Sequence, residues 1–276
     1  MKNIGILQGR LLPEYKNRYQ AHPVNYWQAE FYIAKELGFS QIEFILDFND
    51  VELNPLMSKA GIKEIRKLIS QTGVTVKSVC ADYFMEAPFH SNHQKQSEKV
   101  LKRLIKNAKE LDIIDIVIPC VDQSSLKTED DVKMFVSSVK KALDLAEKSN
   151  ININFETDLN PKDFKNLLSK FSSKNIKVNY DIGNSAALGY KPKDEFKAYG
   201  EHISDLHIKD RLLNAGSVEL GTGNADFKTI FKLLKKYNFS GNIIMQSAKD
   251  DNYIDNLKLV KKQKKFISKY IKNYLD

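Results

Sequence analysis

Eight short runs rich in β-branched residues recur along this chain, and longer segments with a helical pattern separate them. In those segments apolar residues recur at three- and four-residue spacing, the period of an amphipathic helix, as in Leu101, Leu104 and Ala108. Regular alternation of strands with helices predicts a parallel sheet that helices cover. We expect the strands at Ile4–Leu7, Gln41–Leu46, Thr75–Cys80, Asp115–Cys120, Asn152–Glu156, Lys177–Asp181, Ile203–Ile208 and Asn242–Gln246.

The length of the chain, 276 residues, suits closure of these units into one barrel. An open doubly wound sheet is disfavoured, because the first strand is not followed by the Gly-x-Gly-x-x-Gly pattern of dinucleotide-binding sheets. No interdomain linker or low-complexity tract interrupts the sequence. We therefore predict the α/β class, with a single (β/α)8 TIM barrel that forms one domain over residues 1–276.

Local signals mark several helix ends. Thr128 is a typical N-cap residue, and Asn160 precedes a proline that suits the first turn of a helix. Gly73 lies between a helical segment and a strand, where a left-handed C-cap is expected. The last helix is predicted from about Asn252 onward, packed on the outside of the barrel.

Composition excludes several classes of protein. With 42% apolar and 28% charged residues the chain can bury a large core, and no apolar run approaches the roughly 20 residues that span a bilayer. The start of the chain lacks the apolar stretch and cleavage site of a signal peptide, so we expect a cytoplasmic protein. Cys80 and Cys120 both end apolar runs and are interpreted as reduced core residues. The net charge of +8 comes from lysines spread over helix surfaces, which favours a solvated surface over a nucleic-acid footprint.

Polar residues stand at the ends of four successive predicted strands. These are Glu156, Asp181, His207 and Gln246. In a barrel of this kind the chemistry lies at the C-terminal ends of the strands, and carboxylates that follow apolar runs are costly to bury without a partner. One divalent cation would satisfy all four residues, because two carboxylates balance its charge and His and Gln add neutral donors. The alternative is that each residue only caps a strand or pairs with a nearby lysine or arginine.

Other polar residues are expected near the mouth of the barrel. Arg10 follows the first strand and could anchor a phosphate or carboxylate, or form an ion pair with a neighbouring acid. Asp82 follows the third strand and is a candidate partner for a substrate hydroxyl. Lys209 and Arg211 flank Asp210 just beyond His207, and we expect one of them to point into the site. Gly221 and Gly223 could approach a phosphate closely or only shape a turn.

Three late segments resemble the xylose-isomerase-like TIM barrel superfamily, and among its members the sugar phosphate isomerase/epimerase proteins. They are Tyr180–Asn184 (YDIGN), His207–Asp210 (HIKD) and Gly221–Phe227 (GTGNADF), and the similarity extends over essentially the whole chain, including Ile42–Glu43 in the second strand. The resemblance implies one divalent metal, Mn, Mg, Co or Zn, held by Glu156, Asp181 and His207. It also implies that Gln246 stands where the family has a second glutamate.

Two positions depart from that family pattern. Glutamine cannot take a proton, so Gln246 could bind a metal through its carbonyl oxygen but could not serve as a second base. Asn184 stands where related enzymes often carry histidine, and it could donate a hydrogen bond to a sugar oxygen but could not carry a proton. A one-base reaction is therefore easier to support than a two-base epimerisation.

The leading functional hypothesis is a metal-dependent sugar or sugar-phosphate isomerase or epimerase, in which Glu156 is the base that forms an enediolate. Its partner would be a small-molecule sugar or sugar phosphate, without nucleic acid or membrane, and a homo-oligomer is compatible with the sequence. One alternative is a metal-dependent hydrolase of the apurinic-endonuclease type, which needs a richer ligand set than five histidines readily supply. A dehydratase that uses the same metal and base is also compatible with these residues, as is a non-catalytic sugar-binding relative.

Overall fold

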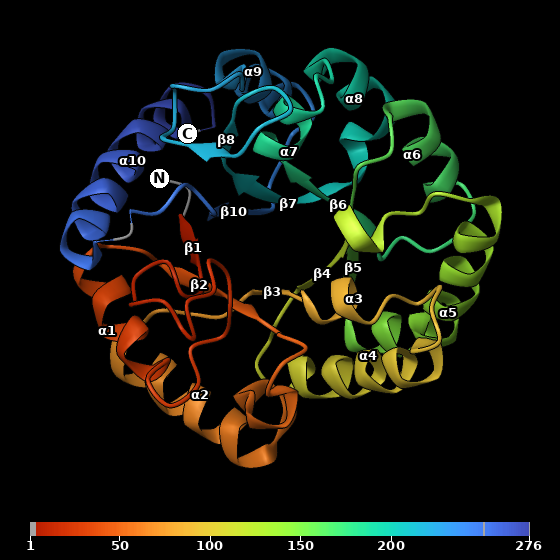
Figure 1. The fold of residues 1–276 in the computed structure, drawn as a ribbon, viewed down its shortest axis with the longest axis horizontal. Helices are drawn as coiled ribbons and strands as arrows, with labels where there is room; N and C mark the ends of the chain where they lie inside the picture. Colours follow the sequence, from red (N-terminus) through yellow and green to blue (C-terminus); the bar gives the residue numbers. More distant parts are fainter. Residues whose placement is uncertain (1–3, 251, 276) are drawn as a thin grey trace.

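All eight predicted runs form strands, and these strands pair in parallel around a closed barrel in the order β1-β10-β7-β6-β5-β4-β3-β2. The structure is a computed structural model that describes residues 4–250 and 252–275. Figure 1 looks down the barrel, with the strands at the centre and the helices in a ring around them. The predicted α/β class and (β/α)8 barrel are confirmed. The barrel strands are β1 (Gly5–Leu7), β2 (Gln41–Ile45), β3 (Ser78–Cys80), β4 (Asp115–Cys120), β5 (Asn152–Thr157), β6 (Ile176–Asp181), β7 (Ile203–Ile208) and β10 (Asn242–Met245).

The helices connect successive strands on the outside of the barrel. Two short helices, α3 (Tyr83–Glu86) and α7 (Ile182–Ala187), follow β3 and β6 directly, and a small antiparallel hairpin of β8 (Asp210–Arg211) and β9 (Ser217–Val218) follows β7. The longer helices are α1 (Gln28–Glu36), α2 (Lys59–Thr72), α4 (Gln94–Lys109), α5 (Glu129–Ser149), α6 (Pro161–Leu168), α8 (Pro192–Tyr199), α9 (Phe227–Lys236) and α10 (Tyr253–Tyr274).

The predicted helix ends have the expected geometry. The Thr128 side chain accepts a hydrogen bond from the Asp131 backbone N–H at 3.1 Å, which caps α5. Asn160 caps α6 in the same way, and Gly73 ends α2 in the left-handed conformation at φ +77°. The third strand is shorter than predicted, because Thr75 pairs with Gln41 only as an isolated bridge and regular pairing begins at Ser78.

The inside of the barrel has an apolar part and a polar part. A small cluster of Leu7, Ile45, Cys80, Val117 and Ile244 lies on the inward faces of five strands, separate from the large core that packs the helices on the sheet. Both cysteines are free and buried, as predicted. Among the residues that the structure describes, no helix is long and apolar enough to cross a membrane. The polar part includes the buried side chains of Asn154, Asn179 and His207.

Candidate metal and substrate site

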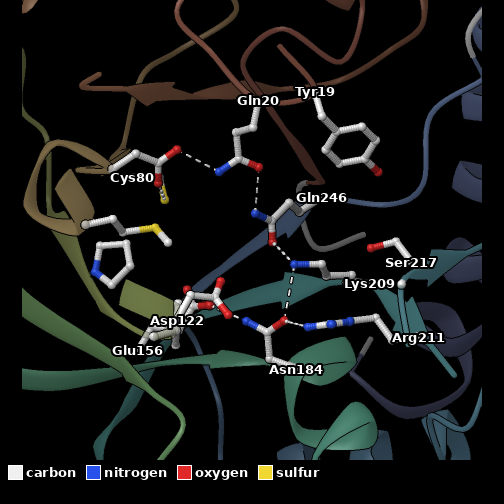
Figure 2. Close-up of a pocket in the computed structure, with 15 residues that line it drawn as sticks. Tyr19, Gln20, Cys80, Asp122, Glu156, Asn184, Lys209, Arg211, Ser217 and Gln246 are labelled. Carbon is white, nitrogen blue, oxygen red and sulfur yellow. Dashed lines mark hydrogen bonds between the residues drawn. The ribbon is translucent and has the colours of Figure 1, made fainter. Parts of the chain in front are cut away.

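A cavity of about 240 Å³ opens at the C-terminal ends of the barrel strands. Figure 2 shows the side chains that line it, with a chain of hydrogen bonds that crosses the cavity between loops distant in sequence. Most of the residues in the wall carry polar side chains, and Met85, Pro119 and Val121 are apolar. The polar side chains in its wall are Tyr19, Gln20, Asp82, Asp122, Glu156, Asn184, Lys209, Arg211, Ser217 and Gln246.

Glu156, Asp181 and His207 converge beside this cavity. They come from the neighbouring strands β5, β6 and β7, and the register places Asp181 directly opposite His207. Nδ1 of His207 lies 3.6 Å from Oε2 of Glu156 and 3.9 Å from Oδ2 of Asp181. One ligand atom of each residue lies within 4.8 Å of the others, and the side chains are buried.

These separations fit a common metal ion. Two ligands that bind one ion at about 2.1 Å lie roughly 3–4 Å apart, depending on the coordination geometry. Two carboxylates also match the charge of a divalent cation, and an imidazole nitrogen suits the transition metals among the candidates. The residues present therefore fit the predicted divalent metal.

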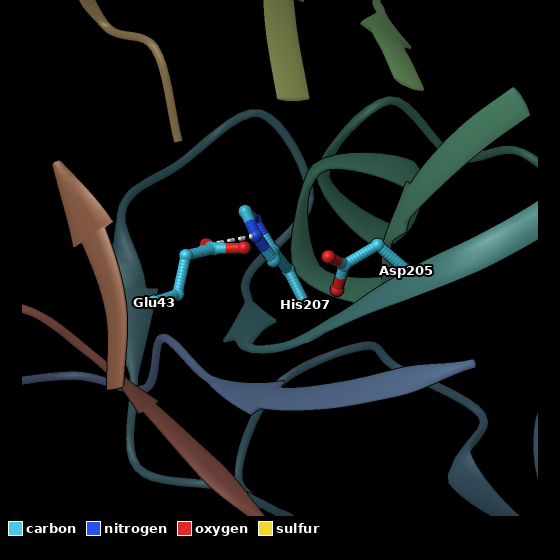
Figure 3. Close-up of side chains that lie close together, drawn as sticks. All are labelled: Glu43, Asp205 and His207. Atoms are coloured by element: carbon cyan, nitrogen blue, oxygen red, sulfur yellow. Dashed lines mark hydrogen bonds and ion pairs between the residues drawn. The ribbon is translucent and has the colours of Figure 1, made fainter. Parts of the chain in front are cut away.

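The ring of His207 is oriented by a carboxylate on the far side of the barrel. Nε2 of His207 lies 2.7 Å from Oε1 of Glu43 on β2, and Figure 3 shows the two side chains facing each other beside Asp205. Both side chains are fully buried. When Nε2 donates its hydrogen to Glu43, Nδ1 faces Glu156 and Asp181, which is the arrangement that orients metal-binding histidines. Burial by itself would lower the pKa of His207. The carboxylates around the ring, above all Glu43, together have the larger effect and raise the pKa above its usual range.

Glu43, Asp205 and His207 form a second group that is close enough to hold a metal. Within this group Nε2 of His207 and Oε1 of Glu43 lie at a direct hydrogen-bond distance of 2.7 Å, whereas Nδ1 lies 3.6 and 3.9 Å from the oxygens of Glu156 and Asp181, which leaves room for an ion between them. We therefore interpret this second group as the support of His207, and Glu156–Asp181–His207 as the candidate metal site.

Both oxygens of Glu156 are held by amides. Asn179 Nδ2 donates to Oε2 at 2.7 Å, and Asn184 Nδ2 donates to Oε1 at 2.6 Å. Burial and, after it, the nearby charge of Asp181 raise the pKa of Glu156 to about 7, against the opposing effect of His207 and Lys209. The carboxyl group is thus fixed in direction, with Oε2 toward His207 and the side chain in the cavity wall.

Gln246 lies just past the end of β10 and faces two ways. Its Nε2 donates to Oε1 of Gln20 at 3.1 Å, and Gln20 in turn donates to Asp82 at 2.7 Å. Its Oε1 lies 3.4 Å from Nζ of Lys209, which also lies 3.2 Å from Oδ2 of Asp181. The carbonyl oxygen of Gln246 therefore points to the side of the metal ligands.

The remaining predicted site residues divide into two groups. Four of them line the cavity, namely Asp82, Asn184, Lys209 and Arg211. Arg211 donates to Oδ1 of Asn184 at 2.9 Å, so Arg211 points into the cavity as Lys209 does. Arg10 does not line it. Its side chain is 2% exposed and donates to the Tyr19 carbonyl at 3.1 Å and to Gln20 at 3.0 Å. Arg10 can thus reach a substrate only through the Tyr19 and Gln20 segment that it supports.

The glycines after the hairpin serve a turn. Gly221 and Gly223 each donate a backbone N–H to Oδ2 of Asp210 at 2.9 Å, and Ala225 donates to its other oxygen at 3.1 Å. The buried Asp210 carboxylate occupies the position that a phosphate would need. Of the two sequence interpretations, the structure favours the turn, which fixes the loop that carries Ser217 into the cavity wall.

Sequence reasoning missed several residues of the site. Asn179 precedes Asp181 by two residues, and the alternation of a strand places both on the inward face, so this signal was available. Glu43 stands between Ile42 and Phe44 in the second strand, and the same alternation turns it to the inward face. Gln20, Asp122 and Ser217 lie in loops or short elements, where no periodic signal marks them.

The chain belongs to the xylose isomerase-like TIM barrel family, whose model matches residues 31–270. It is 26% identical over 257 residues to the putative L-ribulose-5-phosphate 3-epimerase SgbU of Haemophilus influenzae, covering 86% of this chain and 89% of that protein. It is 25% identical over 233 residues to the L-ribulose-5-phosphate 3-epimerase UlaE of Salmonella heidelberg, covering 80% and 81%. The crystal structure of the IOLI protein with a zinc atom bound superposes with a TM-score of 0.75 at 15% identity, covering 99% of each chain. The predicted family is thus confirmed, and the predicted enzyme class, isomerase or epimerase, is the class in which SgbU and UlaE are named.

Proposed function

We propose that this protein is a metal-dependent isomerase or epimerase of a small sugar phosphate. The observation that carries the proposal is the convergence of Glu156, Asp181 and His207, all buried, beside a small polar cavity at the strand ends. The names of SgbU and UlaE support a ketopentose 5-phosphate as the substrate. The ligand set would hold one divalent ion, Mn, Mg, Co or Zn, with Gln246 as a weaker fourth donor.

The metal, when bound, would polarise the oxygens of a hydroxy-ketone and make the adjacent carbon-bound hydrogen more acidic. Glu156 takes that hydrogen. Its Oε2 faces His207, and the hydrogen bonds from Asn179 and Asn184 set the direction of the carboxyl group toward the cavity. Removal of the proton yields an enediolate of the sugar, which Glu156 reprotonates.

The fate of the proton depends on the groups around the substrate. An epimerisation through two bases needs a second proton carrier on the opposite face, and Gln246 cannot supply one. We therefore propose that Glu156 returns the proton on the face from which it was taken, at the neighbouring carbon. Such a transfer, together with passage of the hydroxyl proton from the oxygen that becomes the aldehyde to the former ketone oxygen, converts a ketose into an aldose.

The phosphate would lie against the basic side of the cavity. Lys209 and Arg211 are the cationic side chains among the residues that line it, and Ser217 lies beside Arg211 with its hydroxyl toward the same space, as Figure 2 shows. An arginine fork matches phosphate oxygens, and a hydroxyl adds a donor. Asp82 and Gln20, on the opposite side, would contact sugar hydroxyls.

The test is conversion of phosphorylated ketoses by the metal-loaded protein. L-ribulose 5-phosphate and its stereoisomers would be incubated with Mn²⁺-loaded protein, and the sugars separated by chromatography. We expect a new isomer that chelation of the metal and Glu156→Gln each abolish, whereas Asp115→Asn, in a buried barrel carboxylate outside the cavity wall, retains most of the activity. A folded, metal-loaded protein that converts none of these sugars would contradict the proposal.

Parallel incubations test the alternative functions. A deoxy-keto product would indicate a dehydratase, and cleavage of an abasic oligonucleotide would indicate the hydrolase. Binding of the sugar without turnover, together with activity gained by Gln246→Glu, would indicate a non-catalytic relative. A cytoplasmic location and a homo-oligomeric state remain predictions that fractionation and light scattering would check.

A further inference from the structure

We propose that the ammonium group of Lys209 is a built-in competitor of the metal, seated between Asp181 and Gln246, so that the protein binds metal more weakly than its ligands alone would allow. The inference rests on the proposed function, because it concerns the same ligands. The competition also accounts for the group that lies beside Gln246, the residue that stands where the family has a second glutamate: this group is the Lys209 ammonium.

The contacts of Lys209 are those of a bound cation. Its Nζ lies 3.2 Å from Oδ2 of Asp181, 3.3 Å from Oδ1 of Asn184 and 3.4 Å from Oε1 of Gln246. An ammonium group has three hydrogens to donate, and three oxygens surround it here. The Lys209 side chain is only 14% exposed, so water contributes little to its solvation.

The stem of Lys209 is also held in place. It crosses Gly183 at the start of α7 so closely that a Cβ at position 183 would lie 2.6 Å from Cγ of Lys209 and 2.9 Å from its Cβ. Any larger residue at this position would push the stem aside. The absence of a side chain at Gly183 therefore makes room for this one conformation of the lysine.

A metal and this ammonium group would compete for one oxygen of Asp181, because the other, Oδ1, accepts the Asn184 backbone N–H at 2.8 Å. The ammonium donates to Oδ2 of Asp181, the oxygen that lies 3.9 Å from Nδ1 of His207 and faces the metal position. A divalent cation there would meet a like charge at short range, in a pocket with little screening. The Lys209 ammonium must therefore move away from Asp181 before the metal can bind there. The displaced ammonium would then lie in the cavity wall, where it could contact an anionic substrate.

Calorimetric titration of metal-stripped protein with Mn²⁺, without sugar, tests this competition. We expect Lys209→Met to bind Mn²⁺ at least tenfold more tightly than the wild type. Lys249→Met removes a buried ammonium near the mouth that bonds to Glu14 and Tyr19, away from the ligands, and should leave the affinity unchanged. Circular dichroism would establish that each variant is folded.

The outcomes separate this inference from the proposed function. Mn²⁺ binding by Lys209→Met that equals or falls below that of the wild type would overturn the competition. Tighter binding by Lys209→Met and Lys249→Met alike would also overturn it, because general electrostatics would then suffice. No Mn²⁺ binding by any folded variant would overturn both the inference and the proposed metal site. Tighter binding by Lys209→Met, with the affinity of Lys249→Met unchanged and without conversion of any sugar, would uphold the competition and refute only the proposed activity.

Discussion

His22 should make the stability of this protein fall in mild acid. The ring is 2% exposed and lies against Trp27 and Phe44, with centroid distances of 6.3 and 6.2 Å. Its Nδ1 lies 2.9 Å from Oε1 of Gln8, which also accepts from the Ile45 backbone, so His22 ties the loop after β1 to the barrel. Burial lowers the pKa of His22 from 6.5 to about 4.

The direction of the effect follows from which state binds the proton. The unfolded chain protonates His22 below about pH 6.5, while the folded protein keeps the ring neutral until about pH 4. Stability from this group is therefore complete above the unfolded pKa and is lost as the pH falls toward the folded pKa. Between pH 7.5 and pH 5 the loss is about 2 kcal/mol, because each pH unit between the two pKa values contributes about 1.36 kcal/mol.

The assay is urea unfolding at both pH values, followed by the fluorescence of Trp27, which is the single tryptophan and contacts His22. His22→Asn keeps a donor toward Gln8 but cannot be protonated, so its stability should fall by about 2 kcal/mol less than that of the wild type. Other titrating groups cancel in this difference, including Glu30, whose pKa is raised to about 7 by burial and which acts in the opposite direction. His93→Asn serves as the control. Equal pH dependence in the wild type and His22→Asn would refute the reasoning.

Three further substitutions test how the site is supported. Glu43→Gln removes the charge that holds His207, so Mn²⁺ affinity measured by calorimetry should fall roughly 10–100-fold. Asp115→Asn, in another buried barrel carboxylate, should not change the affinity. Equal affinities of Glu43→Gln and the wild type would contradict this role of Glu43. Asp210→Ala leaves three backbone N–H groups without their acceptor, so the free energy of unfolding in urea should fall by about 2 kcal/mol or more. Proteolysis after β8 should also become faster. An unchanged unfolding midpoint would show that other contacts hold the loop. Glu30→Gln puts an NH2 group in place of one of the two oxygens that accept backbone N–H bonds from the loop after β1. At pH 5, where the folded carboxyl is uncharged because its pKa is raised to about 7, the unfolding free energy should drop by about 1–3 kcal/mol, and no loss would remove Glu30 as an anchor.

The barrel could be predicted from sequence because its signals are local and periodic. The predicted run Asn152–Glu156 differs from β5 by one residue, and Ile203–Ile208 coincides with β7. Parallel strands in register then bring residues at equivalent positions together without further information, which is why Asp181 and His207 meet. The Glu156–Asp181–His207 group is thus a consequence of the strand pattern.

The rest of the site depends on contacts that no local pattern specifies. Glu43 reaches His207 across the barrel from β2, which pairs with β1 and β3 but not with β7. Arg10 looked like a substrate anchor, but the irregular loop that follows β1 places Tyr19 and Gln20 over it. Equally, sequence offered no means to decide between Lys209 and Arg211, and the structure brings both to the cavity. Loop conformation and contacts across the barrel are what the sequence pattern leaves open.

Exchange of substrate hydrogen with solvent tests most directly whether Glu156 removes a proton beside a carbonyl. Mn²⁺-loaded protein would be incubated with L-ribulose 5-phosphate in D₂O, and the sugar examined by NMR and mass spectrometry. We predict deuterium at a carbon adjacent to the carbonyl in the wild type and in Asp115→Asn, and none in Glu156→Gln. Deuterium incorporated equally by Glu156→Gln, or isomerisation of the sugar by a metal-free protein, would contradict the role of this site.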